Sequence, residues 1–408
     1  MIHTQRSYGK VVLAGIALLL ASCNAPQSEK NDTGNTATVQ STENSTTAMV
    51  YVGTYAEHNQ EGIWLFRLNT ETGELQQVLG LKAGENPSYL ALDKERRFLY
   101  AVNETNDYQG KKNGAVTAFA INQKTGDLKL LNKVPSQGMA PCHISLDEPN
   151  KTIMVANYTS GNIVAFPVME NGTVGEQPIV HPPNIGSGPN KERQESAHAH
   201  WIGPSPDGKF AFAVDLGTDE VLRYKLNSER SAVTIETYSK AVAFAAKPGA
   251  GPRHMVFHPS GRFAYVINEL NSTMTSLAYD GEKGEFNELQ TISTLPADYK
   301  GENYCAAVKV SADGKFLYGS NRGHNSIVVY AIDGESGKLT LVQHQDTSGD
   351  WPRDFTLDLT GNVMLVANER SNSIVSFKVD KASGRLMPTG QEVKVSKPVC
   401  LQVVPAFR

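Results

Sequence analysis

The sequence predicts an all-β protein, a seven-bladed β-propeller with four antiparallel strands in each blade. The first observation is a repeat in which an anchor residue, usually Pro, is followed sixteen residues later by an Asn or Asp that ends a strand. The second is that these units, built from short strand-like runs and Gly-containing turns, recur every 46 to 58 residues. The third is that each end of the chain contains only part of a unit, which is typical of a closed ring of blades.

The segment from Gly251 to Glu269 shows the repeated unit most clearly. It reads as a strand, a tight turn at Ser260-Gly261 and a second strand that ends at Asn268. The spacing that joins Pro252 to Asn268 recurs in five other pairs: Pro87 and Asn103, Pro141 and Asn157, Ala199 and Asp215, Cys305 and Asn321, and Pro352 and Asn368. The hairpin at 251–269 therefore predicts the register of the others.

The rest of each unit supplies two more strands, and the two ends of the chain complete one another. After each Asn or Asp, a polar loop leads to a third strand, and a turn of the type Thr/Ser-Gly-x-Leu leads to a fourth. A seventh anchor, Pro398, is followed by one strand only, whereas 49–54 fits the second strand of a unit. The C-terminal strand is therefore expected to close the N-terminal blade and leave no open edge. An irregular array of sandwiches is the alternative.

Composition narrows the class of function. The chain has 408 residues, a net charge of −4 and a pI of about 6.2, so no overall basic surface for nucleic acid is expected. The three cysteines of the predicted propeller, Cys142, Cys305 and Cys400, are odd in number and widely spaced, which predicts buried free thiols rather than a disulfide framework.

The N-terminus has the pattern of a bacterial lipoprotein signal. A short positively charged segment precedes the apolar run 11–20, which is too short to span a bilayer, and Leu20-Ala-Ser-Cys23 matches a lipobox. The alternative is a secretory signal with an incidental Cys. The predicted organisation is a signal peptide at 1–22, a flexible polar tether at 23–47 and the propeller at 48–408.

This organisation predicts a location as well. Acyl chains on Cys23 would anchor the protein to a membrane of the bacterial cell envelope, with the propeller facing the periplasm or the cell surface. The sequence leaves open which membrane this is and what the oligomeric state is.

Candidate site residues follow from the repeat. The first strand of a propeller blade lines the central channel, so residues just after each anchor and just after each Asn should meet at one mouth. Charged and imidazole side chains fill these places in consecutive blades, and such groups are costly to bury unless they are paired or used. The predicted catalytic residues are His200, Arg253, Glu269 and Arg322, and the predicted substrate-binding residues are His143, His198, His254 and Arg353.

Three alternatives remain open at this mouth. Arg253 and Glu269 would form a structural ion pair if they served only the fold, and the histidines would be ordinary core residues. The long segment 181–196 reads equally as a lid and as a tolerated insertion. His198 and His200 with Glu269 have the ligand types of a metal site, but no Asp cluster suits Ca²⁺, and neither a metal nor a cofactor is expected.

Several motifs, taken together, resemble the seven-bladed lactonase family, which includes bacterial 6-phosphogluconolactonase and fungal carboxymuconate cyclase. They are Gly251-Pro-Arg-His-Met with Ile267-Asn-Glu269, Ala140-Pro-Cys-His-Ile144, His198-Ala-His200, Ser320-Asn-Arg-Gly-His324 and Trp351-Pro-Arg-Asp354. The resemblance covers residues 49–404. It implies a metal-independent site that opens or closes lactones on small acidic substrates. It also implies that the cyclase-type set of one His, two Arg and one Glu falls on His200, Arg253, Arg322 and Glu269.

These observations favour a lactone hydrolase that acts on a small acidic or sugar lactone by general acid/base catalysis. Either Glu269 or His200 would activate the water. One alternative is a cycloisomerase of the carboxymuconate cyclase type, and another is a binding propeller of the envelope without enzymatic activity. The phosphogluconate role of the family belongs to cytoplasmic proteins, so the predicted lipoprotein signal leaves the physiological substrate open.

Overall fold

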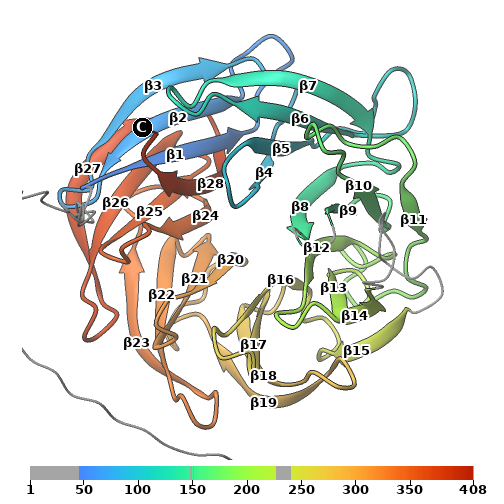
Figure 1. Ribbon diagram of the computed structural model, residues 1–408. Coiled ribbons are helices and arrows are strands. Elements are labelled where there is room, and N and C mark those ends of the chain that lie inside the picture. Colours follow the sequence, from blue (N-terminus) through green and yellow to red (C-terminus); the bar gives the residue numbers. More distant parts are fainter. Residues whose placement is uncertain (1–45, 148, 150, 227–239, 408) are drawn as a thin grey trace, which may run out of the picture. The chain divides into compact units, whose positions relative to one another are not determined.

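The computed structural model describes residues 46–147, 149, 151–226 and 240–407, which fold as strands and connecting loops (Figure 1). The predicted signal peptide, Cys23 and all but the last two residues of the predicted tether lie outside these residues. In the described part of the chain, no helix is long and apolar enough to cross a membrane.

Seven four-stranded antiparallel sheets surround a central channel, and each sheet is one blade (Figure 1). In the description of each blade that follows, the strand given first is the one that lines the channel. Blade 1 contains β28 (Pro398–Pro405), β1 (Thr47–Thr54), β2 (Ile63–Asn69) and β3 (Leu75–Leu81). Blade 2 contains β4 (Tyr89–Leu92), β5 (Phe98–Asn103), β6 (Ala115–Ile121) and β7 (Leu128–Pro135). Blade 3 contains β8 (Pro141–Asp147), β9 (Thr152–Asn157), β10 (Ile163–Pro167) and β11 (Ile179–His181). Blade 4 contains β12 (Ala199–Pro204), β13 (Phe210–Asp215), β14 (Glu220–Lys225) and β15 (Ala241–Ala245).

The remaining three blades have the same order. Blade 5 contains β16 (Pro252–Phe257), β17 (Phe263–Asn268), β18 (Thr273–Asp280) and β19 (Glu285–Ser293). Blade 6 contains β20 (Tyr304–Val310), β21 (Phe316–Arg322), β22 (Ser326–Ile332) and β23 (Leu339–Asp346). Blade 7 contains β24 (Pro352–Leu357), β25 (Val363–Asn368), β26 (Ser373–Val379) and β27 (Leu386–Lys394). The predicted fold class, seven blades of four antiparallel strands, is confirmed.

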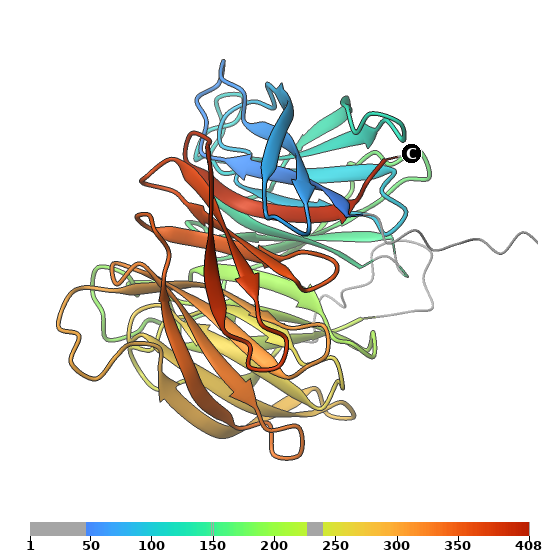
Figure 2. The same ribbon diagram turned by 90° about the vertical axis from the view of Figure 1, so that its left-hand side faces the viewer.

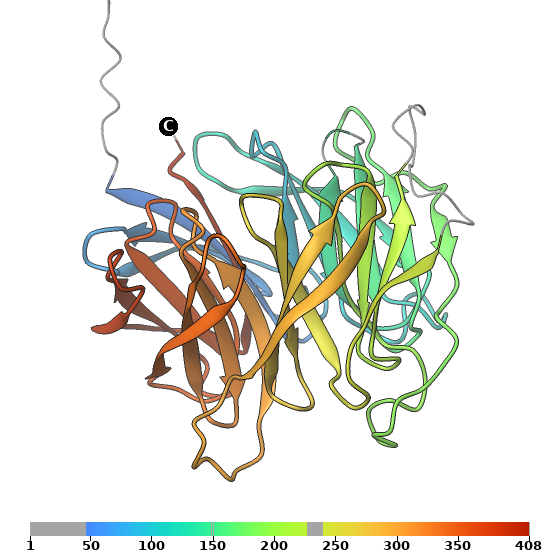
Figure 3. The same cartoon turned by 90° about the horizontal axis from the view of Figure 1, so that it is seen from below.

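The ring closes by pairing the two ends of the propeller. Strand β28 pairs with β1 along most of its length, from Ala48 opposite Pro405 to Gly53 opposite Cys400. Figure 2 shows this C-terminal strand, in dark red, beside the blue N-terminal strands, and Figure 3 shows the ring from below. The predicted closure of the N-terminal blade by the C-terminal strand is therefore confirmed.

The anchor repeat corresponds to strand pairing. In blade 5 the anchor Pro252 lies opposite Asn268, and the anchors of blades 3, 4, 6 and 7 pair with their own Asn or Asp in the same way. Several of these amides also join neighbouring blades. Asn157, Asn321 and Asn368 donate hydrogen bonds to the carbonyl groups of Ser136, Thr294 and Thr347, which follow the outer strand of the preceding blade.

Apolar side chains pack between adjacent sheets, so the core consists of clusters shared by neighbouring blades. One such cluster joins Phe212, from β13, to Phe286, from β19, with ring centroids 4.8 Å apart. The three cysteines of the propeller, Cys142, Cys305 and Cys400, are buried and free, as predicted.

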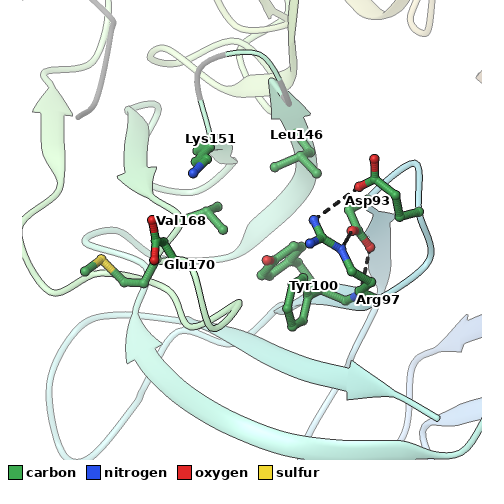
Figure 4. A pocket seen from close by; sticks show the side chains of 10 residues that line it. Asp93, Arg97, Tyr100, Leu146, Lys151, Val168 and Glu170 are labelled. Carbon is green, nitrogen blue, oxygen red and sulfur yellow. Dashed lines mark hydrogen bonds and ion pairs between the residues drawn. The ribbon is translucent and has the colours of Figure 1, made fainter. Parts of the chain in front are cut away.

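A buried tyrosine on the second strand of several blades adds a bond between blades at the end of the channel opposite the anchors. The hydroxyl of Tyr318 donates to the carbonyl of Gly384 at 3.2 Å, and that of Tyr265 donates to Gly337 at the same distance. Tyr100 occupies the matching position on β5, but its buried hydroxyl has no hydrogen-bond partner among the described residues. It borders instead a pocket of about 410 Å³ between blades 2 and 3 (Figure 4).

These two tyrosines allow a matched test of the interblade bond. Tyr318→Phe should lower the free energy of unfolding by about 1 kcal/mol, because the carbonyl of Gly384 loses its donor. Tyr100→Phe should leave stability within about 0.5 kcal/mol of the wild type, because no bond is lost. Urea unfolding followed by tryptophan fluorescence measures both values. Equal losses of unfolding free energy in the two variants would contradict the assignment of an interblade hydrogen bond to Tyr318 alone of this pair.

Candidate active site

A repeated irregularity of the innermost strands directs side chains into the channel. In blade 5, Pro252 pairs with Asn268 and the next pair is His254 with Ile267, so Arg253 lies at a β-bulge. The corresponding residues of blades 3, 4 and 7, which are Cys142, His200 and Arg353, lie at equivalent register shifts. A bulge reorients one side chain relative to the alternation of its strand. Cys142, Arg253 and Arg353 accordingly line one hollow at this mouth, together with Ser88, Tyr89, Glu104, His254 and Val399.

The centre of the site is the carboxylate of Glu269, which three guanidinium groups contact. Its Oε2 lies 2.9 Å from Arg253 Nε and 2.8 Å from Arg322 Nη2. Its Oε1 accepts a hydrogen bond of 2.6 Å from Arg193 Nη2. The contact with Arg253 Nε is an ion pair without the geometry of a hydrogen bond. Three of the four predicted catalytic residues are therefore in direct contact.

The protonation state of Glu269 follows from this arrangement. Burial alone would raise the pKa of its carboxyl, but the charges of Arg322, Arg253 and Arg193 outweigh burial and hold the pKa well below its usual range. Glu269 is therefore ionised at neutral pH, and both of its carboxylate oxygens contact guanidinium groups.

Arg253 and Arg322 are fixed by further bonds. Arg253 Nη1 donates to the carbonyl of Ala306 at 2.9 Å, and Arg322 donates from Nε and Nη2 to the carbonyls of Tyr304 and Cys305. Burial, with the nearby charge of Arg322, lowers the pKa of Arg253 to about 10, so the side chain still carries its proton at neutral pH. The two cations are thus rigid and charged.

Three buried histidines lie beside the arginine cluster. The ring of His254 is 5.3 Å from that of His200 and 5.5 Å from that of His143, and its Nε2 is 3.2 Å from Arg253 Nη1. Burial, reinforced by the charge of Arg253, lowers the pKa of His200 and His254 well below 6.5. Burial and then Lys309 do the same for His143. All three imidazoles are therefore neutral at neutral pH.

His200 and His198, although only two residues apart, have different surroundings. His200 Nδ1 faces the sulfur of Cys142 at 3.7 Å, and its Nε2 has no hydrogen-bond partner among the described residues. His198 lies on the ring of Tyr158, with Nδ1 3.0 Å from the carbonyl of that residue and Nε2 3.1 Å from Glu195. In the described part of the chain, the structure brings together no group of three His, Cys, Asp or Glu side chains that could hold a metal ion.

The fourth arginine, Arg353, lies in a separate hydrogen-bonded group at the same mouth. Its Nη2 donates to the hydroxyl of Tyr55 at 2.5 Å, and that hydroxyl lies 3.1 Å from both carboxylate oxygens of Glu104. Glu104 also accepts a 2.6 Å hydrogen bond from Ser88. Arg353 is thus near the channel, as predicted, but it does not contact Glu269.

The repeat does not identify every residue of this mouth. Arg193 lies in the long loop between β11 and β12, for which the sequence predicts either a lid or an insertion, and nothing in the repeat singles it out. Tyr55 lies one residue beyond the end of β1, the position that Glu269 occupies after β17. A comparison of this position across all blades, including the first, would have found Tyr55. The residue before it, however, is Thr54 rather than the usual Asn, so the repeat is harder to recognise in this blade.

This geometry suits a particular class of chemistry. Rigid guanidinium groups in a buried site bind anions and stabilise an oxyanion as it forms, and a neutral imidazole beside them can accept a proton. The fold and the site thus define a β-propeller with the equipment for acid/base chemistry on an anionic or carbonyl-containing small molecule.

Comparison with known proteins places this site in a family. Residues 49–403 match the family described as lactonase, 7-bladed beta-propeller. The 6-phosphogluconolactonase of Bacillus subtilis is 39% identical over 353 residues, which cover 86% of this chain and 97% of that protein. The 6-phosphogluconolactonase of Formosa agariphila is 36% identical, covering 87% and 99%.

Solved structures agree with this assignment. A putative 6-phosphogluconolactonase from Bacteroides fragilis has a TM-score of 0.79 and 36% identity, covering 88% of this chain and 98% of that one. The periplasmic gluconolactonase of Pseudomonas aeruginosa has a TM-score of 0.80 and 32% identity, covering 88% and 99%. The chain therefore belongs to the seven-bladed β-propeller lactonase family, as its motifs predicted, and is a 6-phosphogluconolactonase-like enzyme.

The buried histidines predict a pH dependence of stability. The folded protein keeps His143, His200 and His254 neutral, whereas the unfolded chain takes up protons on them below about pH 6.5. Stability should therefore fall as the pH is lowered through this range, with each histidine contributing up to about 1.4 kcal/mol per pH unit. His143→Gln should reduce the slope between pH 6 and pH 5 by that amount in urea unfolding.

A neighbouring substitution serves as the control for this slope. Tyr89 contacts the ring of His143 at 4.4 Å, and burial raises its pKa well above 10, so it does not titrate in this range. Tyr89→Phe should therefore leave the slope unchanged. An unchanged slope in His143→Gln would show that this imidazole is not held neutral by the fold.

Proposed function

We propose that this protein hydrolyses a small acidic or sugar lactone, in the manner of a 6-phosphogluconolactonase, at the mouth of the propeller channel and without a metal ion. The observation that carries the proposal is the buried cluster of Glu269 with Arg253 and Arg322, next to the neutral imidazole of His200. The names of the relatives support hydrolysis over cycloisomerisation of the carboxymuconate type. Both reactions would use the same site, and they differ in whether water attacks.

The arginines are proposed to act on the lactone carbonyl. Arg253 and Arg322 carry positive charge at fixed positions, and each is at least nine-tenths buried. Charge-assisted hydrogen bonds from such groups would stabilise the oxyanion that forms when water adds to the carbonyl carbon. Glu269 is then a positioning residue, because it holds the guanidinium groups and balances part of their charge.

The same geometry bears on the choice of base. A carboxylate that contacts three guanidinium groups is a poor proton acceptor, so Glu269 is not proposed as the base. His200 has an unpartnered Nε2 among the described residues and is neutral. It would take a proton as the water oxygen bonds to the carbonyl carbon. It would return that proton to the ring oxygen as the ester C–O bond breaks.

The location is also proposed. The lipobox around Cys23 and the short apolar segment before it support lipid anchoring in the bacterial cell envelope. A structural neighbour is named as a periplasmic gluconolactonase, which supports a periplasmic setting. A substrate available outside the cytoplasm, phosphorylated or not, would then be the physiological one.

Catalysis can be tested on glucono-1,5-lactone and its 6-phosphate. His200→Gln should lower kcat by about 10²- to 10⁴-fold, because the proton acceptor is lost. Glu269→Gln should lower kcat/KM by about 100-fold, because Arg253 and Arg322 lose the group that positions them. Turnover of the wild type should survive EDTA.

The control for these variants is Glu288→Gln, an exposed carboxylate on the outer strand β19 that should leave turnover unchanged. Circular dichroism shows whether each variant is folded. Full activity in folded His200→Gln would remove this residue from the reaction, and loss of wild-type turnover in EDTA would contradict a metal-free mechanism.

Anchoring can be tested by changing Cys23 to Ser in the full chain. The thiol would no longer accept the diacylglyceryl group, so the protein should move from the membrane fraction to the soluble fraction of a bacterial host. Metabolic labelling with palmitate, followed by fractionation, measures both effects. Unlabelled wild-type protein in the soluble fraction would contradict the lipoprotein assignment.

A further inference from the structure

The loop of residues 182–198, between β11 and β12, contributes a side chain to the site. We propose that Arg193 of this loop is a specificity-determining residue that binds the acidic substituent of the lactone, a phosphate or a carboxylate remote from the reacting carbonyl. This inference rests on the proposed lactonase function, because it concerns how the same site selects its substrate.

Exposure distinguishes Arg193 from the other arginines around Glu269. The side chain of Arg193 is 34% exposed, whereas those of Arg253 and Arg322 are 3% and 6% exposed. Arg193 meets Oε1 of the carboxylate, and the two buried arginines meet Oε2. Arg193 is therefore the member of the cluster that a ligand entering from solvent meets first.

The hydrogen bonds of Arg193 leave part of its guanidinium available. Nη2 donates to Glu269 and, at 3.2 Å, to the hydroxyl of Tyr158. Nε and Nη1 have no hydrogen-bond partner among the described residues. By contrast, Arg253 and Arg322 also donate to backbone carbonyls. Arg193 can accordingly bind an anion while it keeps its contact with Glu269.

Neighbouring groups hold this guanidinium in place. It lies over the ring of Tyr304, 5.9 Å from the centroid, in addition to its bond to Tyr158. Three guanidinium groups around the single carboxylate of Glu269 also leave this cluster with a net positive charge. Both features favour a ligand that carries a negative charge.

Buried hydrogen bonds hold the loop of residues 182–198 in place. An insertion without a function would not need such bonds. Gln194, next to Arg193, is fully buried, and its Nε2 donates to the carbonyl of Leu216 and to Asp219 Oδ1, both at 2.8 Å. Asp219 in turn accepts hydrogen bonds of 2.7 Å from the amides of Gly249 and Gly251. The segment that leads into Arg253 is thus tied to the loop that carries Arg193.

Two substrates that differ only by a phosphate group remote from the reacting ester test the proposal. Glucono-1,5-lactone and its 6-phosphate share the reacting ester, so a change at the reacting centre affects both. For Arg193→Gln, kcat/KM should fall roughly 10- to 100-fold on the phosphorylated lactone, mainly through KM, and less than about 3-fold on the neutral one. Arg193→Lys should recover part of the loss. Arg262→Gln, on an exposed arginine of the β16–β17 turn, is the matched control and should change neither substrate.

A carboxylate-bearing lactone, glucaro-1,4-lactone, separates the two acidic groups. A selective loss on both acidic lactones, or on the phosphorylated one alone, supports the proposal and shows which anion is recognised. Equal losses on the neutral and acidic lactones, or no loss at all in the folded variant, would overturn it.

If the wild type hydrolyses none of these lactones, the proposed function fails, but the role of Arg193 can still be measured. Calorimetric titration with 6-phosphogluconate and with gluconate compares the wild type with Arg193→Gln. Weaker binding of the phosphorylated acid by the variant, with gluconate unaffected, would support an anion site at Arg193. Unchanged binding of both acids would overturn it.

Discussion

The pairing of the anchor with the Asn or Asp that ends the next strand, present in blades 3 to 7, is the constraint on which both fold and site depend. It sets the register of the two inner strands. In several blades the side-chain amide of the Asn also donates a hydrogen bond to the preceding blade. The pairing also places the following residue at a β-bulge, which removes that side chain from the alternation of the strand. The same feature that repeats to build the ring therefore presents His200, Arg253 and Arg353 at one mouth.

A second constraint is electrostatic. Glu269, Arg253 and Arg322 are almost fully buried, and removing one member of such a cluster leaves an uncompensated charge that costs about 3–5 kcal/mol. The cluster also joins neighbouring blades, because Arg322 comes from blade 6, Arg253 and Glu269 from blade 5, and Arg193 from the loop before blade 4. Charge pairing thus connects blades at this mouth, whereas tyrosine hydroxyls connect them at the opposite end.

The sequence predicts those features of the structure that recur in every blade unit, and it does not predict those that occur only once. Blade number, register and ring closure were predictable because each unit reports the same spacing, and Arg253, Glu269 and Arg322 were found by their positions within it. Arg193 could not be placed, because a loop of its length has no period to read. Nor could the different surroundings of His198 and His200 be inferred from the His-x-His spacing, because the bulge at His200 breaks the alternation on which such an inference depends.

The two properties that the proposed mechanism of lactone opening needs, a positive charge and a neutral base, depend on one another. Arg253 supplies positive charge that can stabilise an oxyanion, and the same charge, added to burial, lowers the pKa of His200 and keeps it neutral. Glu269 limits this effect by balancing part of the charge, and without it the arginines would repel one another more strongly. In the proposed mechanism, Glu269 takes no proton but still has a role, because its negative charge allows the cationic arginines to lie together beside a neutral histidine in a buried site.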